Sequence, residues 1–133
     1  RFQKTSLFFR DAVNPIKIAR FFESDIGKRA AAAERLYKET PFLMKHKREG
    51  HSVMVQGTID CWFREADGLV LLDYKSNYID LNKKDEYYEH LKEIYMPQLE
   101  LYKEALEKMS GERVKEASLY LFSSDECLRL IQE

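Results

Sequence analysis

The stretch Leu71–Asp80, "LLDYKSNYID", joins an apolar run to an acid and a lysine that are two residues apart. The run "LVLLD" (Leu69–Asp73) has apolar residues on both faces, which is typical of a strand buried between two layers. Because successive side chains of a strand point to opposite faces, Asp73 and Lys75 share one face near the end of this strand. Charged side chains in such a place require a physical reason.

A second acid, Asp60, lies in "GTID" (Gly57–Asp60) on the preceding predicted strand. Residues 53–65 and 69–75 are predicted to form a hairpin, because Ala66, Asp67 and Gly68 are typical of a turn. This pairing would bring the carboxylates of Asp60 and Asp73 together. At a distance of about 4 Å, two carboxylates repel each other by roughly 4 kcal/mol at an effective dielectric constant of about 20.

A divalent cation would offset that repulsion, and carboxylate and carbonyl oxygens are ligands that Mg²⁺ or Mn²⁺ prefers. The predicted ligands are Asp60, Asp73 and the backbone carbonyl of Tyr74. Lys75 would orient or deprotonate a water and neutralise charge on a phosphodiester. The alternative is structural, because an Asp-x-Lys pair on a hairpin is usually a solvated ion pair.

A third element, "QLELY" (Gln98–Tyr102), places Gln98 and Tyr102 on one face of a predicted helix. The stripe that contains them is otherwise mostly apolar, and it comprises Leu91, Tyr95, Gln98, Tyr102, Ala105 and Met109. A buried amide is costly without hydrogen bonds, so Gln98 needs a polar partner. We expect Gln98 to contact a phosphate or a metal-bound water at the site, with Tyr102 beside it.

The remaining pattern predicts a mixed α/β fold. Asn14 and Pro15 are expected to open a helix that ends at Phe22. A second helix is expected from Ser24 towards Tyr37, ended by Pro41. After a loop at 82–86, a helix extends to about Met109, with a kink or a delayed start at Pro97 and an end at Ser110–Gly111. The final predicted strand is 117–122.

Composition limits the classes of protein. A chain of 133 residues is expected to form one domain, and its start at Arg1 suggests a piece of a larger protein. No signal peptide and no run of roughly 18 apolar residues is present. Cys61 and Cys127 lie far apart and are expected to be reduced thiols rather than a disulfide or metal site. The net charge of −1 gives no bulk attraction to nucleic acid.

"GTID", "DYK" and "QLELY" together resemble the GxxD, DxK and QxxxY motifs of the RecB-like branch of the PD-(D/E)XK nuclease superfamily. Within that branch, "VQGTIDCWF", "LLDYKSN", "YMPQLELYKEAL" and "KETPF" are similar to stretches of the nuclease domain of AddA helicase–nuclease subunits. The resemblance covers roughly residues 22–122. Several motifs in the correct order make it specific, whereas each one alone would be weak.

The resemblance implies a restriction-endonuclease-like core in which a mixed central sheet is flanked by helices. It assigns metal binding to Asp60 and Asp73, the catalytic lysine to Lys75, and positions near the DNA to Gln98 and Tyr102. Glu39 is a candidate for an upstream acidic position, although a glutamate before Thr-Pro is as often solvated. Some relatives use an upstream histidine as a metal ligand, but the three histidines here are expected at the surface: His46, His51 and His90.

The resemblance also implies a setting: a Mg²⁺-dependent exonuclease in the bacterial cytoplasm, acting on single-stranded DNA in double-strand-break repair and recombination. An ATP-driven helicase in the parent chain and a partner of the AddB type are expected. Two cysteines cannot supply the four ligands of the usual iron–sulfur cluster, so none is expected. The basic run Lys45–Arg48 would contact phosphates or, more often, form a solvated loop. The alternatives are a catalytically silent DNA-binding domain of the same fold and a stand-alone RecB-like exonuclease or resolvase.

Overall fold

A five-stranded sheet forms the centre of the fold in the computed structural model, which describes residues 15–133. The strands follow one another across the sheet in chain order: β1 (Leu36–Arg48), β2 (His51–Glu65), β3 (Gly68–Lys75), β4 (Val114–Leu121) and β5 (Glu126–Gln132). Only β3 and β4 pair in parallel. The helices are α2 (Pro15–Glu23), α3 (Asp25–Ala32), the short 3-10 helix η3 (Leu81–Lys83) and α4 (Lys84–Ser110). This mixed sheet with flanking helices confirms the predicted fold class.

Apolar side chains on both faces of β3 hold the sheet between two layers of helix. Leu69 and Leu71 belong to the cluster that includes side chains of α4, whereas Val70 and Leu72 belong to the cluster with Phe21 of α2. This alternation follows from the two-residue period of a strand. By the same period, Asp73 and Lys75 continue the side of β3 that faces α4.

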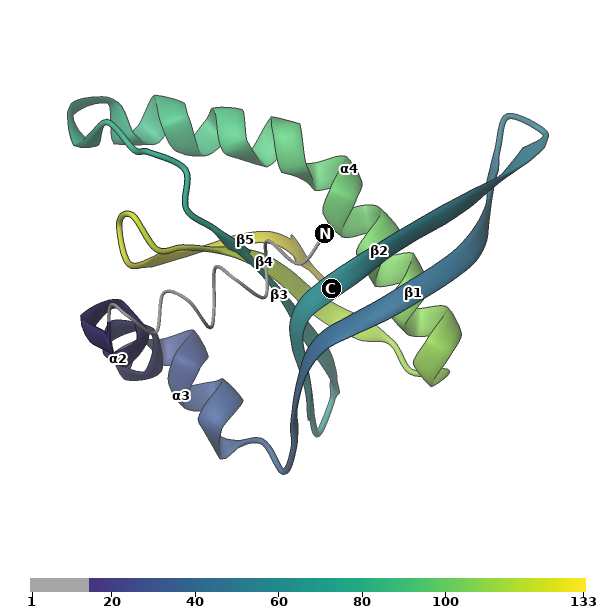
Figure 1. The fold of residues 1–133 in the computed structure, drawn as a ribbon, viewed down its shortest axis with the longest axis horizontal. Coiled ribbons are helices and arrows are strands. Elements are labelled where there is room, and N and C mark those ends of the chain that lie inside the picture. The colour runs from purple at the N-terminus through teal and green to yellow at the C-terminus, as the bar shows by residue number, and fades with distance from the viewer. Residues whose placement is uncertain (1–14) are drawn as a thin grey trace.

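The β2 strand changes partners along its length, and this change creates the most important local feature of the sheet. It pairs with β1 along almost its whole length, but its pairing with β3 runs only from Glu65 to Cys61. Beyond the Cys61–Leu72 pair, β1 and β2 leave the sheet as a two-stranded arm, which Figure 1 shows extending away from β3. Asp60 and Asp73 are the next residues after that last pair. We call this point of separation the fork, and we call residues 40–48 and 51–59 the arm.

The first strand is where the sequence-based prediction fails most clearly. The second helix ends at Ala32, so the prediction that it continues towards Tyr37 is wrong. Tyr37 instead stacks on Trp62 of β2, with ring centroids 3.9 Å apart, and this contact across the β1–β2 ladder favours the extended chain. Pro41 lies within β1 and does not end a helix. Proline is tolerated there because β1 is an edge strand.

Other boundaries differ in smaller ways. The run Lys45–Arg48 is part of β1 and not a loop, and His46 and His51 lie in strands. The last strand, β5, had no predicted counterpart. The helix opened by Pro15 is confirmed, whereas its expected cap Asn14 lies outside the described residues.

The long helix α4 connects β3 to the parallel strand β4 and covers one face of the sheet. It begins at Lys84, so the expected loop to Glu86 is too long, and Pro97 lies inside it. The ribbon changes direction between its two halves (Figure 1), as expected when a proline removes a helical hydrogen bond. Gly111 ends α4 with φ 73°, as predicted. Within residues 15–133, no helix is long and apolar enough to cross a membrane.

Candidate active site at the fork

Asp60 bridges the fork. Its side chain is 3% exposed, and its Oδ2 accepts a hydrogen bond of 2.8 Å from the backbone N–H of Tyr74 in β3. The regular β2–β3 pairing has already ended here, so a carboxylate oxygen takes the place that a strand carbonyl would occupy. The hydrogen bond fixes the Asp60 carboxylate beside β3, at the level of Asp73.

Asp73 and Lys75 form an ion pair on the side of β3 that faces α4. The Lys75 Nζ lies 2.9 Å from Asp73 Oδ2, and the two side chains are 11% and 0% exposed, respectively. This burial differs from that of the solvated ion pair that was the structural alternative. Because water screens the pair poorly, the interaction between its charges is stronger than at the surface.

Gln98 has the polar partner that its place on the stripe requires. Its Oε1 accepts a hydrogen bond of 3.2 Å from Lys75 Nζ, and its Nε2 donates one of 3.0 Å to the hydroxyl of Tyr102. The Tyr102 ring packs edge-on against Phe42 of β1, with centroids 5.5 Å apart. The structure therefore brings Asp73, Lys75, Gln98 and Tyr102 together.

One residue beside the lysine was not predicted as part of the site. The Lys75 Nζ lies 4.1 Å from the ring centroid of Tyr95, one turn before Gln98 on α4. Tyr95 belongs to the predicted stripe, where it was expected to pack against the sheet. The signal that points to it is the spacing of Tyr95, Gln98 and Tyr102, which places all three on one helical face.

Glu39 lies level with Asp60 in the neighbouring strand. The β1–β2 pairing passes from Lys38–Cys61 to Thr40–Ile59, so Glu39 is opposite Asp60. It has φ 52°, in the left-handed region that non-glycine residues adopt at a cost of roughly 1–2 kcal/mol per residue. The half-buried Glu39 is therefore not the fully solvated residue of the alternative interpretation.

The predicted histidine candidates have no place at the fork. His46 Nδ1 lies 2.8 Å from Glu104 Oε1, which connects the arm to α4, and His51 and His90 are exposed. In the described part of the chain, no group of three or more His, Cys, Asp or Glu side chains could hold a metal ion. A cation at the fork would thus have the carboxylates of Asp60 and Asp73 as its acidic ligands.

The donor set at the fork fits a hard divalent cation. Two carboxylates and one ammonium carry a net charge of −1 when all three are ionised (−2 + 1 = −1), and both acids are buried. Mg²⁺ typically takes one or two carboxylates and keeps several positions for water or substrate phosphate. Asp60, Asp73 and the carbonyl of Tyr74 match this preference.

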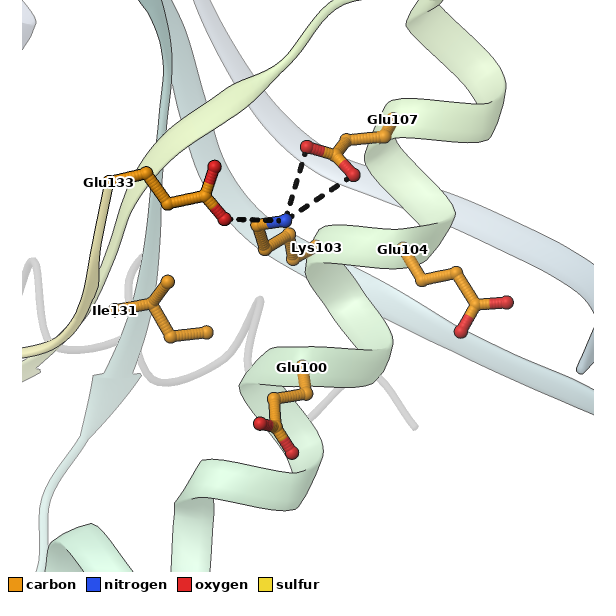
Figure 2. Close-up of a pocket in the computed structure, with 6 residues that line it drawn as sticks. All are labelled: Glu100, Lys103, Glu104, Glu107, Ile131 and Glu133. Atoms are coloured by element: carbon orange, nitrogen blue, oxygen red, sulfur yellow. Dashed lines mark hydrogen bonds and ion pairs between the residues drawn. The ribbon is translucent and has the colours of Figure 1, made fainter. Parts of the chain in front are cut away.

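A more visible hollow lies elsewhere, between α4 and the end of β5. It has a volume of about 300 Å³ and is lined by Glu100, Lys103, Glu104, Glu107, Ile131 and Glu133. Figure 2 shows Lys103 between Glu107 and Glu133, and its Nζ lies 3.3 Å and 3.0 Å from their carboxylates. With four glutamates and one lysine, this hollow repels phosphate groups. It is therefore a poor candidate for a nucleic-acid site.

Comparisons with known proteins agree with the motifs at the fork. The family model of the PD-(D/E)XK nuclease superfamily matches residues 8–130. Three relatives bear the name of the AddA-type subunit of an ATP-dependent helicase/nuclease. The protein of Clostridium novyi is 42% identical over 86% of this chain, that of Alkaliphilus metalliredigens 41% over 86%, and that of Thermoanaerobacter sp. strain X514 40% over 83%. The matched part is 10% of each relative. This chain belongs to the PD-(D/E)XK nuclease superfamily.

Proposed function

We propose that this chain is a Mg²⁺-dependent deoxyribonuclease domain that hydrolyses phosphodiester bonds of single-stranded DNA within an AddAB-type helicase–nuclease. The observation that carries the proposal is the convergence of Asp60, Asp73 and Lys75 at the fork. Both acids are almost fully buried there, and the lysine is fixed against one of them.

In this proposal, Asp60 and Asp73 hold the divalent cation, with the backbone carbonyl of Tyr74 as a further ligand. A divalent cation in such a site polarises the phosphodiester and activates a water for attack. The hydrogen bond from Tyr74 N–H to Asp60 Oδ2 supports these assignments, because it holds the Asp60 carboxylate beside the second acid. Each of these residues is thus oriented before any substrate arrives.

Lys75 has the catalytic role. Its ammonium would stabilise the negative charge that builds up on the phosphorus-bound oxygens, and it would help to orient or deprotonate the attacking water. Gln98 keeps the ammonium directed towards the fork through its Oε1. Cys61, the neighbour of Asp60, is unsuited to be a nucleophile because burial raises the pKa of its thiol to about 11.

The substrate and the partners follow from the relatives. The relatives named above are ATP-dependent helicase/nuclease subunits about ten times as long as the matched segment. We infer that a helicase in the parent chain unwinds DNA and delivers a single strand to the fork, and that the parent chain pairs with a partner of the AddB type. A domain that receives its substrate in this way does not need a strongly basic surface, and the net charge of −1 agrees with that. Gln98, Tyr102 and Glu39 would lie near the strand.

Cutting of a labelled single-stranded oligonucleotide tests the proposal. We expect the wild-type chain to cut it in Mg²⁺ and to stop in chelator. Asp73→Asn should reduce the rate by at least about 10³-fold, because it removes several kcal/mol of transition-state stabilisation. The matched control is Asp67→Asn, which makes the same change at an exposed turn at the other end of β3. Equal rates for the two variants would contradict the assigned mechanism.

Calorimetric titration with Mn²⁺ separates metal binding from chemistry. Asp60→Asn should lose binding at the fork, whereas Lys75→Met should keep binding and lose the cutting rate. A wild-type chain that binds DNA but neither binds Mn²⁺ nor cuts would be a silent DNA-binding domain, and the proposed function would be wrong.

A further inference from the structure

We propose that Tyr95 is a positioning residue for Lys75: its ring face holds the ammonium in the orientation that the reaction needs. This inference rests on the proposed function, since it assumes that Lys75 acts on the phosphodiester. The observation behind it is the distance of 4.1 Å between Lys75 Nζ and the Tyr95 ring centroid. That distance is well within the range of about 6 Å over which a ring attracts a cation.

The ammonium of Lys75 has three kinds of contact, and each constrains it differently. Asp73 Oδ2 and Gln98 Oε1 lie 2.9 Å and 3.2 Å away and accept along specific N–H directions. The ring of Tyr95 attracts the positive charge as a whole, without requiring one N–H to point at a lone pair. Two acceptors leave one of the three N–H groups for a phosphate oxygen, and the ring limits where the ammonium can move.

The position of Tyr95 is set mainly by α4. Tyr95 and Gln98 are three residues apart on one face of that helix, so the same rigid element carries the ring and the amide. The hydroxyl of Tyr95 accepts a hydrogen bond from Asn77 Nδ2, but at 3.4 Å this bond is long and weak. The ring face is therefore the important part of Tyr95, and the hydroxyl is secondary.

A packing role is the competing explanation, because Tyr95 also lies against the main apolar cluster. The two explanations differ in which substitution is tolerated. If Tyr95 only fills space, leucine should replace it with little effect on Lys75. If the ring face holds the ammonium, phenylalanine should replace it and leucine should not.

The first test is an NMR measurement on the metal-free chain without DNA. An aromatic ring shifts the proton signals of groups over its face upfield. The εCH₂ signals of Lys75, assigned by their loss in Lys75→Met, should therefore be shifted upfield in the wild type and in Tyr95→Phe. They should return to ordinary values in Tyr95→Leu. The matched control is Tyr87→Leu, the same change at another tyrosine of α4 that lies against the same cluster, and it should leave the signals unchanged.

The second test is the cutting rate in Mg²⁺. Tyr95→Leu should lower kcat about tenfold with KM nearly unchanged, whereas Tyr95→Phe should stay within about twofold of the wild type. Tyr87→Leu should behave as the wild type. Unchanged Lys75 signals in Tyr95→Leu, or a kcat equal to that of Tyr87→Leu, would overturn the inference. If the wild type cut no DNA, the positioning role would fall with the proposed function, and an intact upfield shift would show that the ring contact itself is present.

Discussion

The fork and the arm are built from the same strand, β2, yet their side chains are held by different means. At the fork, Asp60 and Asp73 are buried and fixed by contacts from β3 and α4. On the arm, Leu43 and Met54 are 65% and 60% exposed, although their backbone lies in an unbroken β1–β2 ladder. Regular pairing is thus strongest where the side chains are free of packing, and it ends where the side chains have a task.

This difference explains why the reactive groups lie at the fork. Where β2 separates from β3, backbone N–H groups and buried side chains need new partners, and polar side chains supply them. Asp60 and the Lys75–Gln98 pair do this in positions that the surrounding core allows little freedom. The arm has no such core on its outer side, so a precise constellation could not be held there.

The largest difference in stability should appear between Leu71 and Leu43. Leu71 is fully buried two residues before Asp73. We expect Leu71→Ala to lower the free energy of unfolding by about 2–5 kcal/mol, because it removes apolar contacts and leaves a cavity. Urea denaturation followed by circular dichroism measures this value. A loss below about 1 kcal/mol would mean that the sheet under the fork is not tightly packed.

A smaller effect is expected at Gly57, where the arm meets the fork. A Cβ added there would lie 2.9 Å and 3.0 Å from ring carbons of Phe42 and 3.4 Å from the Tyr102 ring. Gly57→Ala should therefore cost about 1–3 kcal/mol of unfolding free energy, because the two rings must shift. Since Tyr102 bonds Gln98, we also expect slower cutting than in the wild type. A variant with wild-type stability and rate would show that this contact is not needed.

The smallest effect belongs to the outer surface of the arm. Leu43→Ala changes a mostly exposed side chain and should alter the free energy of unfolding by no more than about 0.5 kcal/mol. The same denaturation experiment serves as its measurement. A change as large as that of Leu71→Ala would remove the contrast between the two regions.

Much of the fork could be predicted from sequence because its signals are local. The two-residue spacing of Asp73 and Lys75, the turn at 66–68 and the four-residue spacing of Gln98 and Tyr102 each fix a relation between neighbours. The hairpin, β3 and the motif residues follow from them. Both cysteines are free, as expected.

The edges of the sheet could not be predicted in the same way. β1 contains Pro41 and many charges, and its extended form depends on Tyr37 stacking on Trp62 and on the ladder with β2. These are contacts between residues more than twenty positions apart, which no local pattern reveals. The contact of Tyr95 with Lys75 is of the same kind.

Anomalous diffraction from crystals grown with Mn²⁺ tests the central claim most directly, because it locates the cation without relying on activity. We predict a peak at the fork within coordination distance of the Asp60 and Asp73 carboxylates, and no such peak in Asp60→Asn. A peak only at another site, or carboxylates of Asp60 and Asp73 on opposite sides of the sheet, would contradict the account.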